Sequence, residues 1–277
     1  MFRFLLAGAA LTMAALAQQS QNPSPMVEHT RAHPRLPETH PPGQRGKLDL
    51  GTLYVPTGSA PELLVFFHGG TWLPEAAAAK NRISVLSVQA GSGSSTYGRL
   101  FTDAERFPKL VEEARTKAGI RFHRILLGGW SAGCGALRQI LRAPESYAMV
   151  DTVICIDGIH TDYLDGKPGP LESKIDPANL EIWAQFARDA IAGRKRFLVT
   201  HSEIFPGTFA STTETADWLL AALVLKPRAV VRWGPMGTQQ LSDARAGGFH
   251  MIGFAGNSAP DHVDQLHSLP EYLKWVR

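Results

Sequence analysis

The pentapeptide Gly129-Trp130-Ser131-Ala132-Gly133 is the strongest candidate for chemistry in this chain. It follows an apolar run of strand length at 124–127 and precedes a helical pattern that continues to Leu141. A serine hydroxyl becomes a nucleophile only when it is held exposed and a base removes its proton. A sharp strand-to-helix turn provides this exposure, and the crowding of such a turn explains the glycines two residues to either side of the serine. We therefore predict that Ser131 is a nucleophile.

A second glycine-rich turn, His68-Gly69-Gly70, follows the apolar run at 62–67. A nucleophile that attacks a carbonyl creates an oxyanion, which needs backbone N–H donors that are already in place. Small residues let the backbone approach such an oxygen closely. The sequence therefore predicts an oxyanion hole made of the Gly70 and Ala132 amides, with His68 bracing the loop.

Apolar runs of strand length alternate with helical patterns along the chain. Strands that are apolar throughout are buried on both faces, and their alternation with helices predicts a mostly parallel sheet covered by helices on both sides. In such sheets the functional residues gather at the carboxyl ends of the strands, where both glycine-rich turns lie. The expected strands lie at 48–55, 62–67, 83–88, 124–127, 150–156, 197–200, 229–233 and 249–254.

Several residues predict where helices begin and end. Capping boxes, in which two side chains satisfy free amides at a helix start, are expected at 102–105 and 211–214. Pro177 is placed to be the first residue of a helix. Gly119 and Gly193 are placed to end helices in the left-handed conformation.

With the His68-Gly69-Gly70 loop placed before the G-x-S-x-G turn, the chain resembles the α/β-hydrolase superfamily, in particular its esterase- and lipase-like branches. The resemblance extends from about residue 47 to the end of the chain. It implies an α/β fold with a mostly parallel eight-stranded sheet flanked by helices. It also implies a triad in the chain order serine, acid, histidine. The resemblance does not define the substrate, because this fold hosts many chemistries.

The resemblance places the general base after the last strand, where three histidines compete. His250 falls inside the apolar run that forms this strand. His262 follows the strand after a short loop and opens the last helical segment, which is where the superfamily has its base. His267 lies further along the same segment. We expect His262 to be the base.

Two residues compete for the acid of the triad. The acid must hold the imidazole in the correct tautomer and stabilise the imidazolium. Asp157 ends the run at 150–156, a position that some lipases and phospholipase-like members of the superfamily use. Glu203 ends the following strand, which is the commoner position in the superfamily. The sequence favours Asp157 and leaves Glu203 open.

Aromatic side chains near the same edge are candidates for the wall of a substrate pocket, since such pockets are mostly apolar. The candidates are Trp72, Tyr97, Trp130 and Phe205. The connection at 158–176 is long enough to serve as a lid, with a plain surface loop as the alternative.

The N-terminus predicts export. Arg3 precedes an apolar stretch at 4–15, and Ala15-Leu16-Ala17 matches a small-residue cleavage site, so residues 1–17 form a signal peptide. The stretch is shorter than the roughly 20 residues that a membrane-spanning helix needs, and no later segment reaches that length. Residues 18–46 are proline-rich and are expected to form a flexible lead-in to a hydrolase domain at 47–277. The mature protein is expected to be secreted or periplasmic.

The charge and the cysteine content argue against a nucleic-acid-binding protein and a metalloprotein. The chain has 28 Lys and Arg against 25 Asp and Glu without a long basic run, so no nucleic-acid partner is expected. Cys134 and Cys155 are interpreted as two buried free thiols, and a disulfide remains open because export permits one. Two cysteines without a nearby histidine or acidic cluster do not predict a metal site.

Together these features predict a serine hydrolase that cleaves the carboxylic ester of a small molecule through an acyl-enzyme intermediate, with no cofactor. The same triad would also serve a peptidase, an amidase or an acyltransferase. From another class, an exported binding protein that keeps the fold without turnover is the remaining alternative. The sequence says nothing about the oligomeric state.

Overall fold

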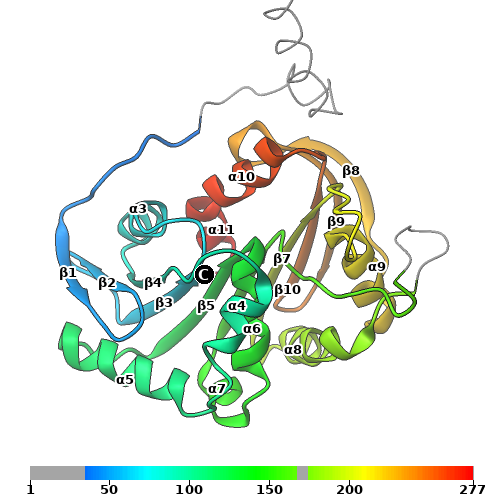
Figure 1. Ribbon diagram of the computed structural model, residues 1–277. Helices are drawn as coiled ribbons and strands as arrows, with labels where there is room; N and C mark the ends of the chain where they lie inside the picture. Colours follow the sequence, from blue (N-terminus) through cyan, green and yellow to red (C-terminus); the bar gives the residue numbers. More distant parts are fainter. Residues whose placement is uncertain (1–34, 167–173, 277) are drawn as a thin grey trace, which may run out of the picture.

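A computed structural model describes residues 35–166 and 174–276 (Figure 1). The predicted signal peptide and most of the lead-in lie outside this range. The described residues form one sheet with the strand order β1-β2-β4-β3-β5-β6-β7-β10-β9-β8. The strands are β1 Gly43–Lys47, β2 Thr52–Pro56, β3 Glu62–Phe67, β4 Ser84–Val88, β5 Arg124–Trp130, β6 Thr152–Ile156, β7 Arg196–Ser202, β8 Arg228–Trp233, β9 Gln239–Ala246 and β10 Phe249–Phe254.

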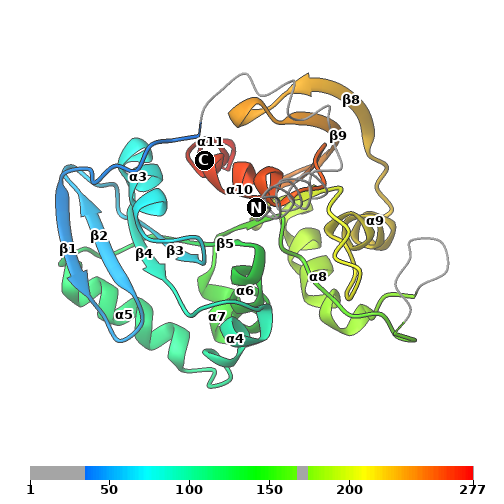
Figure 2. The same ribbon diagram turned by 45° about the horizontal axis from the view of Figure 1, so that its top comes forward.

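The centre of the sheet is parallel and both edges are antiparallel. Strands β4, β3, β5, β6, β7 and β10 pair in parallel. Strands β1 and β2 form one antiparallel edge, and β9 and β8 form the other. Figure 2 shows these edges at opposite ends of the molecule. The predicted fold class, α/β with a mostly parallel sheet flanked by helices, is confirmed.

The predicted number of eight strands is wrong, because ten strands are present in the described residues. Strand β9 was missed because its sequence, QQLSDARA, contains no apolar run. Strand β1 was missed because it is short, polar and largely exposed. It lies within the segment expected to be a flexible lead-in, so the sheet begins before residue 47. Arg35, earlier in that segment, forms a 2.7 Å ion pair with Asp264.

Helices cover both faces of the sheet (Figures 1 and 2). Strand β3 shows why both faces are buried: Leu63, Val65 and Phe67 pack into one core cluster, while Leu64 and Phe66 pack into the other. The first cluster includes residues of α5, α6, α8 and α9, and the second includes residues of α3, α10 and α11. The helices are α3 Trp72–Asn81, α4 Ser94–Arg99, α5 Arg106–Ala118, α6 Cys134–Leu141, α7 Pro144–Met149, α8 Glu181–Ile191, α9 Thr212–Ala222, α10 Ala259–His267 and α11 Leu269–Trp275.

The predicted helix ends have mixed outcomes. The capping box at 211–214 is present, and Gly119 ends α5 in the left-handed conformation. Pro177 begins a short 3-10 turn rather than α8 itself. The capping box predicted at 102–105 is wrong, because Asp103 accepts a hydrogen bond from the Glu105 amide and α5 starts only after it.

Cys134 and Cys155 form a disulfide, so the preferred interpretation as free thiols is wrong. Cys134 is the first residue of α6 and Cys155 lies on β6. Their Cα atoms are 6.0 Å apart, within the range that a disulfide spans. The sequence did not reveal the pairing because it depends on how α6 packs against β6. No helix among the described residues is both long enough and apolar enough to cross a membrane.

Replacing both cysteines, as in Cys134→Ala/Cys155→Ala, is expected to lower the free energy of unfolding by about 3 kcal/mol, because the disulfide restricts the unfolded chain. Urea unfolding with and without a reductant measures the effect. Reductant should bring the wild type down to the stability of the double variant and leave that variant unchanged. Equal stability of the wild type and the double variant in the absence of reductant would contradict a disulfide in solution.

Candidate active site

Three neighbouring strands of the parallel centre end in strained backbone at the same edge of the sheet. His68 follows β3, Ser131 follows β5 and Asp157 follows β6, and their φ angles are 74°, 50° and 43°. Residues with a Cβ rarely adopt this left-handed conformation, which costs about 1–2 kcal/mol per residue. Strain of this kind persists where the surrounding structure enforces it, and it gathers at functional sites.

The glycines around Ser131 are needed because the elbow is packed against its neighbours. A Cβ on Gly133 would lie 2.1 Å from the Phe67 carbonyl oxygen at the end of β3. A Cβ on Gly158 would lie 2.5 Å from the Ser131 carbonyl oxygen. The turn after Asp157 is therefore pressed against the serine backbone. Sequence reasoning explained Gly133 but missed Gly158, which belongs to no motif.

Asp157 is a buried carboxylate, only 1% exposed, whose oxygens accept four hydrogen bonds. The Ser202 amide (3.0 Å) and the Thr212 hydroxyl (2.6 Å) donate to Oδ1. The Ser202 hydroxyl donates to Oδ2 at 2.7 Å, and the fourth partner of the carboxylate is the His262 ring. Burial acts to raise the pKa of Asp157, but the bonds from His262, Thr212 and Ser202 outweigh it and lower the pKa. The carboxyl is therefore ionised at neutral pH.

His262 lies on α10, and its Nδ1 is 2.7 Å from Asp157 Oδ2. Trp130, next to Ser131 in the chain, donates from Nε1 to the His262 carbonyl oxygen at 3.0 Å and packs its ring against the imidazole at 4.6 Å. Because Nδ1 is engaged, Nε2 is the nitrogen available to exchange a proton. No hydrogen bond joins Ser131 to His262 in the described part of the chain, a bond that is often long in the absence of substrate.

The other candidates for base and acid lie in different surroundings. His250 sits near the start of β10, 2.7 Å from Asp243. His267 is buried and contacts Trp72 edge-on at 5.7 Å. Glu203 is exposed, and its carboxylate accepts a hydrogen bond from the Gly256 amide at 3.4 Å. Of the two predicted acids, the structure brings Asp157 to His262.

The loop after β3 is held in a defined shape. The His68 ring stacks on Trp130 at 5.0 Å, and its Nδ1 is hydrogen-bonded to the Tyr97 hydroxyl at 3.0 Å. Burial and the nearby charge of His262 lower the pKa of His68. The Gly70 amide donates to the side-chain oxygen of Gln89 at 3.2 Å. Gly70 is therefore not a free donor here, and no pattern in the sequence predicts this bond.

A cavity of about 570 Å³ contains Ser131 and Ala132. None of the four aromatic residues predicted for the pocket wall lines it: Tyr97 is fully buried, Phe205 is half exposed, and the aromatic residue in the wall is Phe209. Residues 160–162 of the long connection line the cavity, while residues 167–173 lie outside the described chain. The remaining lining residues are mostly polar: Gly93, Ser94, Ser95, Arg138, His160, Thr161, Asp162 and Asn179.

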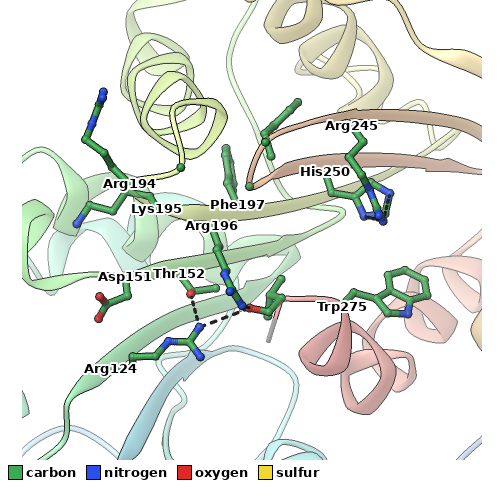
Figure 3. Close-up of a pocket in the computed structure, with 15 residues that line it drawn as sticks. Arg124, Asp151, Thr152, Arg194, Lys195, Arg196, Phe197, Arg245, His250 and Trp275 are labelled. Atoms are coloured by element: carbon green, nitrogen blue, oxygen red, sulfur yellow. Dashed lines mark hydrogen bonds between the residues drawn. The ribbon is translucent and has the colours of Figure 1, made fainter.

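A second cavity of about 570 Å³ lies at the opposite edge of the sheet, where the parallel strands begin (Figure 3). Arg124 and Arg196 both donate to the Val276 carbonyl oxygen there. His250, one of the three candidate bases, lines this cavity, but Ser131, Asp157 and His262 do not, so it is not the place for the chemistry of Ser131. Within the described residues, no cluster of three or more His, Cys, Asp or Glu is arranged to hold a metal ion.

No family model and no curated protein matches this sequence. Among solved structures, the chain is similar to an acetyl xylan esterase from Aspergillus awamori, with 14% identity, a TM-score of 0.48, and coverage of 81% of this chain and 92% of the other. It is also similar to a hormone-sensitive lipase from a metagenome library, with 12% identity, a TM-score of 0.49 and 96% of each chain covered. A dienelactone hydrolase from Anabaena variabilis has 12% identity, a TM-score of 0.45, and coverage of 86% of this chain and 97% of the other. Similarity at this level does not allow a function to be transferred to this chain. Any inference about its chemistry must come from the geometry of its own site.

In the variant Asp157→Asn, the free energy of unfolding is expected to change less with pH in the acidic range than in the wild type. Because the folded-state pKa lies below the ordinary value of 3.8, the carboxylate contributes its full stabilisation above that value and loses it as the pH falls through the lowered pKa. The difference in the free energy of unfolding between wild type and Asp157→Asn should therefore narrow below about pH 4. Urea unfolding across this range measures it, with Glu203→Gln as the exposed control. A difference that stays constant in acid would refute an ionised Asp157.

Proposed function

We propose that the protein is a serine hydrolase that cleaves a carboxylic ester through a Ser131–His262–Asp157 triad. The observation that carries the proposal is the hydrogen bond between the buried Asp157 carboxylate and His262, placed beside a strained serine turn. The three residues follow the chain order serine, acid, histidine, and the serine sits on a strand-to-helix elbow, as in α/β-hydrolases. Both features come from the site itself.

In the proposed reaction, Ser131 Oγ attacks the ester carbonyl carbon while His262 Nε2 takes the hydroxyl proton. The carbonyl π electrons move to the oxygen, which becomes an oxyanion. The tetrahedral intermediate then collapses, the C–O bond to the alcohol breaks, and His262 returns the proton to the leaving oxygen. Water repeats the sequence on the acyl-enzyme and releases the acid.

The Ala132 amide, at the start of the 3-10 turn behind Ser131, is the first proposed oxyanion donor. Gly70 is the second, and its amide becomes available when Gln89 moves away. Gln89 lies exposed just after β4, so this movement requires no change in the core. In the resting state, Gln89 bonds both the N–H and the carbonyl of Gly70 and fixes the loop.

We further propose that the mature protein is secreted or periplasmic. The disulfide between Cys134 and Cys155 supports this proposal, because disulfides persist in oxidising compartments. Mass spectrometry of the mature protein tests it, with an N-terminus at Gln18 as the expected result.

Ser131→Ala is expected to abolish labelling by a fluorophosphonate and to lower kcat on an activated acetate ester by about 10⁴-fold or more, because the nucleophile is gone. His262→Ala should slow both reactions strongly, since no base remains. Mass spectrometry of the labelled peptide identifies the modified residue. A folded wild-type protein without an adduct on Ser131 would refute the proposal, and turnover of amides in preference to esters would assign a peptidase or amidase.

Asp157→Asn is expected to lower kcat by about 10⁴-fold, because the amide holds His262 in the wrong tautomer. Glu203→Gln should leave kcat within a few-fold of wild type, because among the described residues Glu203 bonds only the backbone of Gly256. Steady-state kinetics with the same activated ester compare the two variants. The reverse order of effects would make Glu203 the acid.

A further inference from the structure

The cavity beside Ser131 contains more polar side chains than ester hydrolysis requires. Small-molecule pockets are usually apolar, with a few polar groups that determine orientation. Here the wall combines a guanidinium, a carboxylate, an imidazole, a carboxamide and several hydroxyls. The triad and the oxyanion donors account for none of the groups contributed by Arg138, Asp162 or Asn179.

Arg138 supplies the donors of this wall. It lies on α6, the helix that begins behind Ser131, and its Nη1 donates to the His160 carbonyl oxygen at 3.1 Å. It forms no ion pair with any described carboxylate. Burial lowers the pKa of its guanidinium, but an arginine stays charged in proteins and carries more N–H donors than this one bond uses.

Asp162 supplies the acceptors. Its side chain is exposed at the cavity and makes no hydrogen bond to a described residue. Together Arg138 and Asp162 leave the wall without a net charge, which argues against both an anion and a cation as the ligand. Asn179 adds an amide, although its oxygen already accepts from Arg142 at 3.2 Å.

His160 and Phe209 complete the cavity. Burial lowers the pKa of His160 to about 4, so the imidazole is neutral and has one donor and one acceptor nitrogen. Its Nδ1 is buried without a partner among the described residues. Phe209 packs edge-on against it at 5.2 Å and gives the wall an aromatic surface.

We infer that this cavity binds a hydroxyl-rich group, so that the substrate is the ester of a sugar or a similar polyol; the inference rests on the proposed hydrolase function. A hydroxyl both donates and accepts, and so satisfies Arg138 and Asp162 alike. An apolar group would desolvate these side chains without compensation. The C–H face of a sugar ring also suits the Phe209 ring.

Two acetate esters of a hydroxymethyl group on a six-membered ring test the inference: methyl 6-O-acetyl-glucopyranoside and its carbocyclic analogue cyclohexylmethyl acetate. The second lacks every hydroxyl of the first. Acetate release by the wild type is expected to give a kcat/KM at least about 10-fold higher for the sugar ester, because a site built for hydroxyls discriminates against an analogue without them. The trans-4-(acetoxymethyl)cyclohexanecarboxylate ion serves as the anionic counterpart.

Arg138→Met and Asp162→Asn are expected to lower kcat/KM for the sugar ester by about 10-fold and to leave the cyclohexylmethyl ester nearly unchanged. The second ester also shows that each variant is folded. Arg121→Met, which removes an exposed cation from the loop before β5, should change neither value.

Equal kcat/KM for the two neutral esters, or a preference for the carbocycle, would overturn the inference. A preference for the carboxylate ester that depends on Arg138 would also overturn it and would make the cavity an anion site. If the protein fails to hydrolyse the sugar ester while fluorophosphonate still labels Ser131, the inference about the substrate would be refuted and the proposed hydrolase function would stand. Loss of labelling itself would refute the proposed function.

Discussion

The site depends on one hydrogen bond, between the buried carboxylate of Asp157 and the ring of His262. A carboxylate that is 1% exposed is tolerated only when its oxygens are fully bonded. Asp157 meets this condition with donors from the end of β7, from the start of α9 and from α10. The same set of bonds therefore joins three elements that are distant in sequence. The histidine is oriented by a group whose own position is determined by the fold, which is the preorganisation that an acyl-transfer site needs.

The strand ends that surround this hydrogen bond have a strained backbone. His68, Ser131 and Asp157 stand on neighbouring strands and each adopts a left-handed backbone. Their turns pack against one another so closely that Gly133 and Gly158 have no room for a Cβ. The disulfide adds a covalent connection between the helix behind Ser131 and the strand that leads to Asp157. A tightly packed core does not deform continuously, so Ser131 and Asp157 are held at a defined separation.

Local patterns in the sequence predicted the parallel centre of the sheet from its apolar runs, and the serine turn from its place after one of these runs. His262 was expected as the base only from the resemblance to the α/β-hydrolases, which have a histidine after the last strand. The acid remained open because Asp157 and Glu203 both end strands, and the choice depends on Ser202 and Thr212, which reach the carboxylate through tertiary packing. Gln89 was missed for the same reason, since nothing near it in the sequence points to Gly70. The four aromatic residues of the pocket wall were predicted only from their place near the carboxyl edge of the sheet. This prediction was wrong, because a place in the sequence does not determine the direction in which a ring points. Strand β9 gave no signal because its residues are polar.

The residues proposed to catalyse the reaction are different from the polar residues proposed to bind the substrate. The proposed triad sits on strand ends and on α10, whereas Arg138 lies on α6, and Asp162 and Asn179 lie in the connection between β6 and α8. None of the second set hydrogen-bonds to Asp157 or His262, and all of its members line the cavity. Substitutions in the second set would therefore change which ester is bound without disturbing Asp157. A fold built in this way keeps one chemistry while its loops select the substrate.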